Sequence, residues 1–235
     1  MPSVWRWRLA DRIAPDRRTV HAMISRWLDD DHHADRKPWS WTLVRGDADR
    51  AIDIALLDDT LVDRLITGAE AYRQSSMATP IRQVAVATWP QLAGSPAQTH
   101  WTMEFLSPVT FRRGQAFLPW PAPSSVFGSL RSSWRLFGAP HVGDVTLDLK
   151  LDPIVVSAMK GESQTERVVL RRSTAAHDRP TQLMVTGFTG SMRYAVDGAI
   201  DPSAVASLVA LAPYAGVGAY TTWGFGAVRN LGYGK

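Results

Sequence analysis

The amino-acid sequence predicts an α+β fold in which one order of strands and helices occurs twice. In some segments apolar residues alternate with polar ones, which is typical of half-buried strands. In others they recur every three or four positions, which is typical of amphipathic helices. Along the 235 residues these segments follow the order strand-helix-strand-strand-helix-strand two times, and a glycine-rich loop precedes the last strand. Because this order defines the ferredoxin-like unit, we predict two such units in tandem.

The first unit is predicted to occupy residues 1–90. Thr19 and Thr60 are suitable N-caps, because their hydroxyl groups can accept a hydrogen bond from the first turn of a helix. In chain order, the predicted elements are a strand at 5–9, a helix at 20–28, strands at 39–44 and 50–57, a helix at 61–72 and a strand at 83–89. Residues 91–98 are rich in Pro, Gly and Ala and are predicted to be a linker.

The second unit is predicted to occupy residues 99–235. Its first helix follows Pro123, has Ser124 as its cap and stops at Gly138. Asp201-Pro202 starts its second helix, because proline suits the first helical position. In chain order, the predicted elements are a strand at 101–105, a helix at 124–138, strands at 145–151, 166–170 and 183–194, a helix from 202 onward and a strand at 225–231. This list has one more strand between the two helices than the first unit has.

Composition narrows the classes of protein that the chain can belong to. The net charge is +4, and the only lysines are Lys37, Lys150, Lys160 and Lys235, so nearly every cation is an arginine. Arginine binds phosphate bidentately, which permits a nucleic-acid partner without requiring one. The absence of cysteine excludes disulfides, cysteine-ligated zinc and thiol nucleophiles. No apolar run approaches the roughly 20 residues of a membrane span, and the first nine residues lack a signal-peptide core, so we expect a cytoplasmic protein.

Two Gly-x-Gly pairs lie within residues 216–226, between the last predicted helix and the last predicted strand. Glycine adopts positive φ and permits close approach to the backbone, and consecutive exposed N–H groups in such a loop suit an anion. The loop is not a P-loop, because no Gly-Lys is followed by Ser or Thr. It is not a dinucleotide fingerprint either, because Thr221 stands where a third glycine is needed.

Three stretches of the chain resemble a family of RNA-processing proteins. Residues 187–226 contain Gly-Phe-Thr-Gly, the helix and both Gly-x-Gly pairs, residues 105–137 contain Phe-Leu-Ser-Pro and a helix that begins with Val-Phe, and residues 32–40 lead into Lys-Pro-Trp-Ser. In this order they resemble the endoribonucleases that process CRISPR precursor transcripts, within the repeat-associated RNA-binding (RAMP) superfamily. The block at 187–226 is the most specific of the three.

The resemblance implies cleavage of RNA without a metal, by attack of a ribose 2′-hydroxyl on the adjacent phosphate. This reaction needs a base, an acid and cations that stabilise the phosphorane. His32 and His33 occupy the place of the family's catalytic histidine, and His33 is favoured because it is nearer to Lys37, the predicted stabilising cation. Arg36 is a weaker candidate for that cation. His21 on the first helix is a further candidate, and each of these residues also has an alternative interpretation as an ordinary solvated side chain.

RNA contact is expected from the glycine-rich loop and from pairs of arginines, each of which can also be a solvated surface. Within the loop we expect Trp223 to pack and Tyr220 to contact RNA. The full set of predicted RNA-binding residues is Gly216, Gly218, Tyr220, Gly224, Gly226, Arg112, Arg113, Arg131, Arg135, Arg171 and Arg172.

We therefore expect an endoribonuclease that converts CRISPR repeat RNA into guide RNA with no cofactor and no metal. It can remain on its product with other subunits of an effector complex. The Asp-Asp-Asp-His-His run at 29–33 could bind a divalent ion, but it has no further spaced ligands. Because related subunits share the fold and the glycine loop, the alternative is a non-catalytic RNA-binding subunit of a CRISPR complex. An unrelated α+β protein whose glycine loop is a structural turn is the third interpretation.

Overall fold

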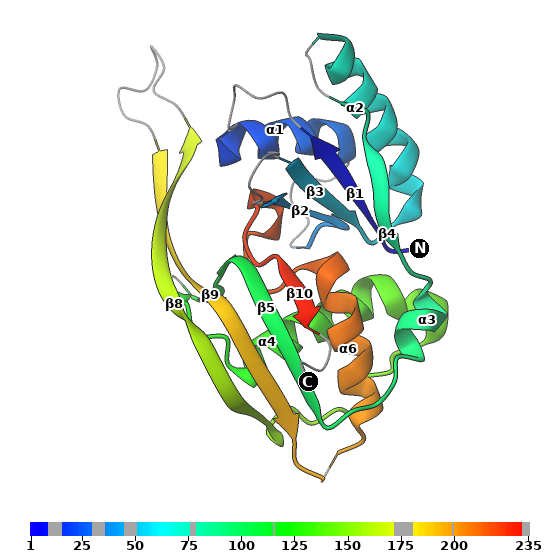
Figure 1. The fold of residues 1–235 in the computed structure, drawn as a ribbon, viewed down its shortest axis with the longest axis vertical. Coiled ribbons are helices and arrows are strands. Elements are labelled where there is room, and N and C mark those ends of the chain that lie inside the picture. The colour runs from blue at the N-terminus through cyan, green and yellow to red at the C-terminus, as the bar shows by residue number, and fades with distance from the viewer. Residues whose placement is uncertain are drawn as a thin grey trace.

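The computed structural model contains two β-sheets, each with helices packed on one face (Figure 1). It describes residues 1–8, 16–29, 36–44, 51–75, 79–114, 116–171, 181–198 and 200–231. Both sheets are four-stranded, and a separate two-stranded ribbon is formed by β6 (Phe111–Arg113) and β7 (Ala116–Leu118). None of the helices in the described part of the chain is both long and apolar enough to cross a lipid bilayer.

The first unit has the strand order β2-β3-β1-β4 with every neighbouring pair antiparallel, which is the ferredoxin-like arrangement. In chain order its elements are β1 (Ser3–Arg8), α1 (Arg17–Leu28), β2 (Trp39–Val44), β3 (Ala51–Leu56), the 3₁₀ turn η1 (Asp59–Leu61), α2 (Val62–Ser75) and β4 (Arg82–Val86). This confirms the predicted order of strands and helices in the first half of the chain.

Helix α1 is placed by a cap at its start and by an apolar stripe along one face. Asp16 accepts a hydrogen bond from the backbone N–H of Thr19, so Asp16, and not the predicted Thr19, is the N-cap. Val20, Ile24 and Leu28 recur every four residues and are buried against the sheet. The other side of the helix is therefore left to face the second unit.

The second unit has the strand order β10-β5-β9-β8, which is the same connectivity as in the first unit. Its elements are α3 (Trp89–Ala93), β5 (His100–Val109), β6, β7, α4 (Pro123–Ser133), the π-helical turn η2 (Trp134–Gly138), α5 (Ala139–Val142), β8 (Ile154–Arg171), β9 (Thr181–Val196), α6 (Pro202–Ala215), the 3₁₀ turn η3 (Thr221–Trp223) and β10 (Val228–Leu231). Two tandem ferredoxin-like units are thus confirmed.

Residues 145–151, predicted as a strand, form turns instead. The Asp144 carboxylate accepts hydrogen bonds from the backbone N–H and the hydroxyl of Thr146, which bends the chain. As a result Leu147 is 73% exposed, although alternation predicted it to be buried. The second strand of this unit is β8, which begins at Ile154 and continues for 18 residues.

Two further boundaries differ from the predictions. Gly138 does not end the helix that contains α4, because the turn η2 carries the chain into α5, which ends before Gly143 at φ +80°. The predicted linker at 91–98 begins inside α3, where Thr88 and Gln91 form a capping box. The first of these changes extends the helical layer of the second unit beyond its predicted end.

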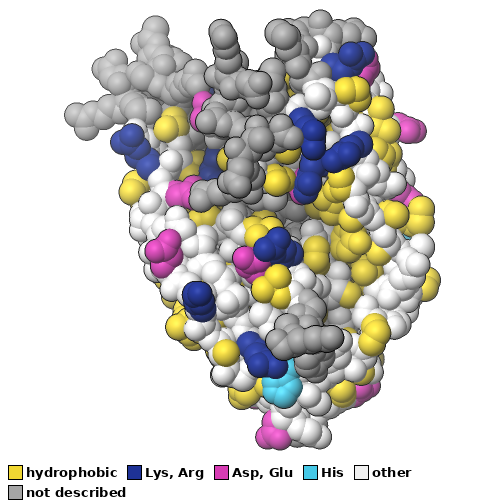
Figure 2. Space-filling view, in the orientation of Figure 1, with side chains coloured by type: hydrophobic (Ala, Val, Ile, Leu, Met, Phe, Trp, Pro, Cys, Tyr) yellow, Lys and Arg dark blue, Asp and Glu magenta, His cyan; other side chains and the backbone are white. Residues whose placement is uncertain are grey.

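The long hairpin of β8 and β9 extends past its own sheet and runs beside α1 of the first unit (Figure 1). On the face shown in Figure 2, Lys and Arg side chains are spread over both units and are interspersed with acidic ones. The distribution of charge on this face therefore does not mark one site, and the junction between the units is more informative.

Candidate functional site

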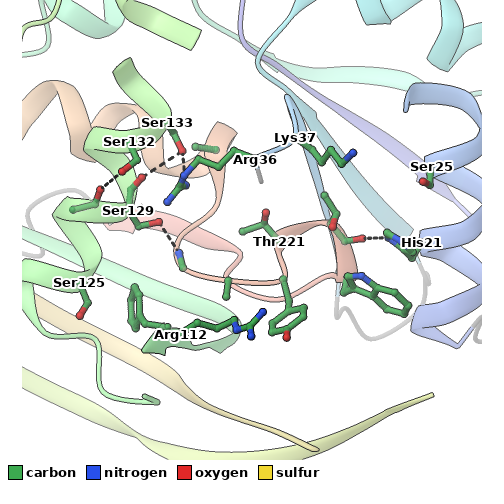
Figure 3. A pocket seen from close by; sticks show the side chains of 18 of the residues that line it. His21, Ser25, Arg36, Lys37, Arg112, Ser125, Ser129, Ser132, Ser133 and Thr221 are labelled. Atoms are coloured by element: carbon green, nitrogen blue, oxygen red, sulfur yellow. Dashed lines mark hydrogen bonds between the residues drawn. The ribbon is translucent and has the colours of Figure 1, made fainter. Parts of the chain in front are cut away.

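A cavity of about 1000 Å³ lies at the junction of the two units (Figure 3). The first unit contributes one face of α1 and the residues just before β2, and the second contributes α4, β6 and the loop between α6 and β10. The residues that line the cavity are His21, Ser25, Asp29, Arg36, Lys37, Phe111, Arg112, Ser125, Gly128, Ser129, Ser132, Ser133, Ala215, Gly218, Ala219, Tyr220, Thr221, Thr222 and Trp223.

The four glycines of the two Gly-x-Gly pairs all have positive φ, and each is in tight contact with neighbouring atoms. A Cβ at Gly218 would lie 2.3 Å from the carbonyl oxygen of Thr110, and one at Gly226 would lie 1.9 Å from that of Val217. Only glycine meets both requirements. The glycines therefore shape the loop between α6 and β10, here called the glycine loop (residues 216–226).

Most backbone N–H groups of the glycine loop donate inside the protein, which contradicts the anion-cradle interpretation of these groups. The N–H of Gly218 donates to the hydroxyl of Ser129, and the N–H groups of Val217, Ala219, Trp223, Gly224, Phe225 and Gly226 donate to backbone carbonyls. RNA contact by Gly216, Gly218, Gly224 and Gly226 has no direct support from these bonds and stays a prediction. The loop instead presents side chains and carbonyl oxygens to the cavity.

The aromatic residues of the glycine loop have different surroundings. Tyr220 adopts the left-handed conformation (φ 62°), and its ring contacts Phe117 and Phe225 while it also lines the cavity. The Trp223 ring stacks on the ring of His21 with a centroid separation of 4.0 Å. Trp223 packs as expected, and RNA contact by Tyr220 stays a prediction.

His21 lies on α1 and faces the cavity (Figure 3). Its Nδ1 atom is 2.8 Å from the carbonyl oxygen of Thr222. A carbonyl oxygen can only accept, so Nδ1 carries the proton of this hydrogen bond and Nε2 is the basic nitrogen of the neutral ring. Stacking on Trp223 and this hydrogen bond hold the ring in one orientation, which differs from a solvated histidine on a helix surface.

Lys37 and Asp29 form an ion pair at the edge of the cavity. Lys37 Nζ is 3.6 Å from Asp29 Oδ2, and the side chain of Asp29 is only 4% exposed. The Asp29 carboxylate also accepts hydrogen bonds from the hydroxyl of Ser25 and from Nε1 of Trp39. The charge of the predicted catalytic lysine is therefore balanced by a carboxylate.

Arg36 lines the cavity, and its guanidinium is partly removed from water. Its guanidinium donates from Nη1 to the hydroxyl of Ser133 on α4, at 3.1 Å. None of the ion pairs among the described residues involves Arg36. Burial lowers the pKa of the Arg36 guanidinium, as expected for a charge that has lost water without gaining a counter-ion. A phosphate in the cavity would supply that counter-ion.

The predicted arginine pairs have different surroundings, and RNA contact by them stays a prediction. Arg112 lines the cavity, and Arg113 is exposed at the end of β6. Arg131 donates to the carbonyl oxygen of Leu149, and Arg135 pairs with Asp144. Both side chains therefore connect the helical segment to the turns that follow it. Arg171 ends β8, but its side chain is not described, and Arg172 lies outside the described residues.

His32 and His33, the predicted catalytic histidines, lie outside the described residues. The described residues on either side of them, Asp29 and Arg36, both line the cavity. Among the residues that the structure describes, no group of three or more His, Cys, Asp or Glu side chains is arranged to hold a metal ion.

Sequence reasoning missed one residue of the junction, Arg17, and missed the partner of another, His21. Arg17 of α1 was not singled out, although it bonds to the glycine loop and to β8. His21 was named without its partner, because Thr222 lies 201 residues away in the chain. A helix that places Arg17, His21 and Ser25 on one face is the only sequence signal that could have found them.

The arrangement suits acid-base chemistry on a phosphate. The oriented imidazole of His21 and the guanidinium of Arg36, which has no carboxylate partner among the described residues, line the same cavity. Residues of both units line this cavity. Imidazole exchanges protons near neutral pH, and guanidinium stabilises the charge of a phosphorane.

Comparison with known proteins agrees with this assignment. Residues 103–228 match the model of the family described as "CRISPR-associated endoribonuclease Cas6". A protein of that name from Mycobacterium tuberculosis is 29% identical over 136 residues, which are 57% of this chain and 40% of that relative. The match thus spans well under half of the length of the relative.

Solved structures with similar folds cover nearly the whole chain. A Cas6 product complex has a TM-score of 0.80 at 21% identity and covers 98% of this chain and 99% of its own. Thermus thermophilus Cas6 has a TM-score of 0.67 at 23% identity and covers 98% of each chain. A RAMP protein described as binding different RNA substrates has a TM-score of 0.59 at 13% identity, and the match covers 99% of this chain and 100% of that protein. At these identities the likeness establishes the fold.

Proposed function

We propose, because the chain belongs to the Cas6 family of CRISPR-associated endoribonucleases, that it cleaves CRISPR repeat RNA to release guide RNAs. The observation that carries the proposal is the cavity between the units, where His21 and Arg36 face the same space. The similar structures described as Cas6 product and substrate-mimic complexes support an RNA substrate.

In the proposed reaction the 2′-hydroxyl of one ribose attacks the adjacent phosphorus atom. A base accepts the proton of that hydroxyl, the bond from phosphorus to the 5′-oxygen breaks, and an acid protonates the leaving oxygen. The products are a 2′,3′-cyclic phosphate and a 5′-hydroxyl. No water, metal or other cofactor takes part in this step, so the residues of the cavity must supply both proton transfers.

Three histidines are candidates for the proton transfers. His21 supports the proposal directly, because its hydrogen bond to Thr222 leaves Nε2 as the basic nitrogen of the neutral ring. We propose His33, or else His32, as the second group, because the chain before and after them lines the cavity at Asp29 and Arg36. One imidazole would then act as the base and the other as the acid.

Two cations are candidates for stabilising the phosphorane. Arg36 is suited to hold the scissile phosphate, because its charge is desolvated and no carboxylate of the described residues pairs with it. Lys37 remains a second cation, held in place by Asp29. Arg112 and the loop residue Tyr220 also line the cavity and would contact the bound RNA.

We further propose that the protein acts in the cytoplasm, where its transcript would be made, and that it stays on the product with other subunits of a CRISPR complex. One similar structure is described as a partial Cas6-RT-Cas1–Cas2 complex, which supports such an assembly for that relative. Co-purification of guide RNA and partner subunits with the tagged protein would test this part.

The reaction is tested with end-labelled repeat RNA and purified protein in the presence of EDTA. We expect one cut per repeat and a 2′,3′-cyclic phosphate on the upstream product. A single 2′-deoxy substitution at the cut should block cleavage without preventing binding, because it removes only the nucleophile. Cleavage that requires Mg²⁺, or that proceeds on the 2′-deoxy RNA, would exclude this mechanism.

A non-catalytic RNA-binding subunit is the second candidate, and the balanced charge of Lys37 favours it. The discriminating experiment compares His21→Ala, His32→Ala and His33→Ala, singly and together, at enzyme concentrations that saturate the RNA. If the unmodified protein binds repeat RNA but never cuts it, the protein is a binding subunit. If it cuts and all three substitutions leave the rate unchanged, the catalytic groups lie elsewhere.

A further inference from the structure

Arg17 connects the first unit to two separate segments of the second. At the start of α1, its Nε and Nη2 atoms donate to the two carboxylate oxygens of Glu166 on β8, at 2.8 and 3.2 Å. Its Nη1 atom donates to the carbonyl oxygens of Trp223 and Gly224, at 3.0 and 2.7 Å. The guanidinium also lies over the ring of Phe225, 4.3 Å from its centroid.

These bonds meet the glycine loop at the turn that also holds His21. Arg17 and His21 lie four residues apart on α1, so they project from the same side of the helix. Arg17 binds the carbonyl oxygens of residues 223 and 224, and His21 binds that of Thr222. The position of the Thr222 carbonyl, and of the Trp223 ring under the imidazole, therefore depends on where the loop is held.

The packing around Gly224 shows how closely the loop fits against this side chain. A Cβ at Gly224 would lie 2.5 Å from Nη1 of Arg17 and 2.8 Å from the ring of Trp41. Trp41 of β2 also donates from Nε1 to the carbonyl oxygen of Thr222, at 2.7 Å. The carbonyl that orients His21 is thus fixed from one side by β2, and the residues after it are fixed by Arg17.

We propose that Arg17 is a positioning residue that holds the glycine loop against α1 and thereby sets the orientation and the tautomer of His21. This inference rests on the proposed role of His21 in RNA cleavage. It also links β8 to the cavity, because the same guanidinium that binds the loop is held by Glu166. A displacement of the β8–β9 hairpin would then shift the side chain of Arg17 and, with it, the part of the glycine loop that orients His21.

The variants that test the inference are Arg17→Gln, Arg17→Lys and Glu166→Gln, with Arg26→Gln as the matched control. Arg26 lies on the same helix and is exposed. The first measurement is single-turnover cleavage of repeat RNA, with the dissociation constant measured separately on 2′-deoxy RNA. The second is the ¹⁵N spectrum of the histidine side chains of the free protein, with the His21 signals assigned by His21→Gln.

We expect Arg17→Gln to lower the single-turnover rate constant about 100-fold, as is typical when a catalytic group is displaced by about 1 Å. The dissociation constant should change less than about threefold, and the His21 signals should move from the Nδ1–H tautomer toward a mixture of tautomers. Arg17→Lys should not restore the rate, because an ammonium cannot bind a carboxylate and two carbonyls in the same plane. Arg26→Gln should behave as the unmodified protein.

The inference is overturned if Arg17→Gln leaves the His21 signals unchanged, or if Arg17→Lys restores the rate, since charge alone would then suffice. If Arg17→Gln does not fold, Glu166→Gln provides the same test with the guanidinium retained, and unchanged His21 signals again overturn the inference. The spectrum needs no substrate. An unmodified protein that never cuts RNA would therefore contradict the proposed function, while the spectrum would still decide the role of Arg17.

Discussion

Gly226→Ala is predicted to lower the free energy of unfolding more than Gly114→Ala, which replaces a glycine that has no close neighbours among the described residues. Gly226 has φ +67°, and a Cβ there would lie 1.9 Å from the carbonyl oxygen of Val217. The left-handed conformation costs a non-glycine residue about 1–2 kcal/mol. The added carbon must also push apart two hydrogen bonds, from Val217 N to Gly226 O at 2.8 Å and from Gly226 N to Pro108 O at 3.0 Å.

Each of these two hydrogen bonds contributes about 1 kcal/mol, so the expected loss in the free energy of unfolding is about 3–4 kcal/mol. Gly114→Ala is the matched control, because Gly114 has φ +61° but no described atom lies within 4 Å of its Cβ position. The free energy of unfolding of Gly114→Ala should fall only by the conformational cost of about 1–2 kcal/mol. The difference between the two variants therefore gives the part of the stability loss that is due to close packing, apart from the part that is due to backbone conformation.

Urea titration at pH 7 measures both losses, and single-turnover cleavage of repeat RNA measures the consequence for the cavity. Gly226→Ala should slow cleavage, because the loop that orients His21 has moved, and Gly114→Ala should not. Equal losses of stability in the two variants would refute the close packing of the glycine loop. A stable Gly226→Ala protein with unchanged cleavage would refute the link between the loop and the cavity.

Three further predictions concern single side chains. Arg36→Gln should leave the free energy of unfolding unchanged or raise it, while weakening RNA binding about tenfold and lowering the salt slope of binding by about one, as measured by filter binding. Asp29→Asn should cost about 3 kcal/mol in thermal unfolding, because it removes the buried negative charge that Lys37, Ser25 and Trp39 contact. Tyr194→Phe should cost about 1 kcal/mol at pH 8, since the hydroxyl donates to the carbonyl oxygen of Pro121. Burial raises the pKa of Tyr194, so its contribution is present below about pH 10, where the unfolded phenol is protonated, and is lost as the pH rises further. The difference between Tyr194→Phe and the unmodified protein should therefore shrink by pH 11.

Each of these predictions has an opposite outcome that would contradict its reasoning. A large loss of stability in Arg36→Gln would mean that the guanidinium holds the fold rather than a ligand. A stability of Asp29→Asn equal to that of the unmodified protein would mean that the buried pair carries no net energy. A stability difference for Tyr194→Phe that does not change between pH 8 and pH 11 would mean that the phenol does not titrate on unfolding.

Local sequence patterns were sufficient to predict the order of the strands and helices in the first unit. The apolar stripe of α1 and the Asp201-Pro202 start of α6 are signals confined to a few residues, and both are found as predicted. The alternation of Val145, Leu147, Leu149 and Leu151 failed because Asp144 binds the chain two residues ahead, and this turn outweighs the pattern. The first half of β8 lacked a pattern, because it is an exposed edge strand with few buried side chains.

The candidate site was less accessible to prediction, since its geometry depends on contacts between distant parts of the chain. The glycine loop was recognised, but its N–H groups proved to bond within the protein, and its carbonyl oxygens receive Arg17, His21 and Trp41. We expected Lys37 rather than Arg36 to stabilise the phosphorane, whereas the structure pairs Lys37 with Asp29 and places Arg36 beside a serine. No local pattern shows which of two adjacent cations has a buried carboxylate beside it.

The central claim is that RNA is cut in the cavity between the two units, and photocrosslinking tests it most directly. Repeat RNA with a 2′-deoxy-4-thiouridine at the cut would bind without being cleaved, and irradiation would attach it to the nearest side chains. We predict that mass spectrometry will find the crosslinks in α1, at Arg36 or Lys37, and in residues 219–223. Crosslinks confined to residues outside this cavity, such as the outer faces of the two sheets, would contradict the account.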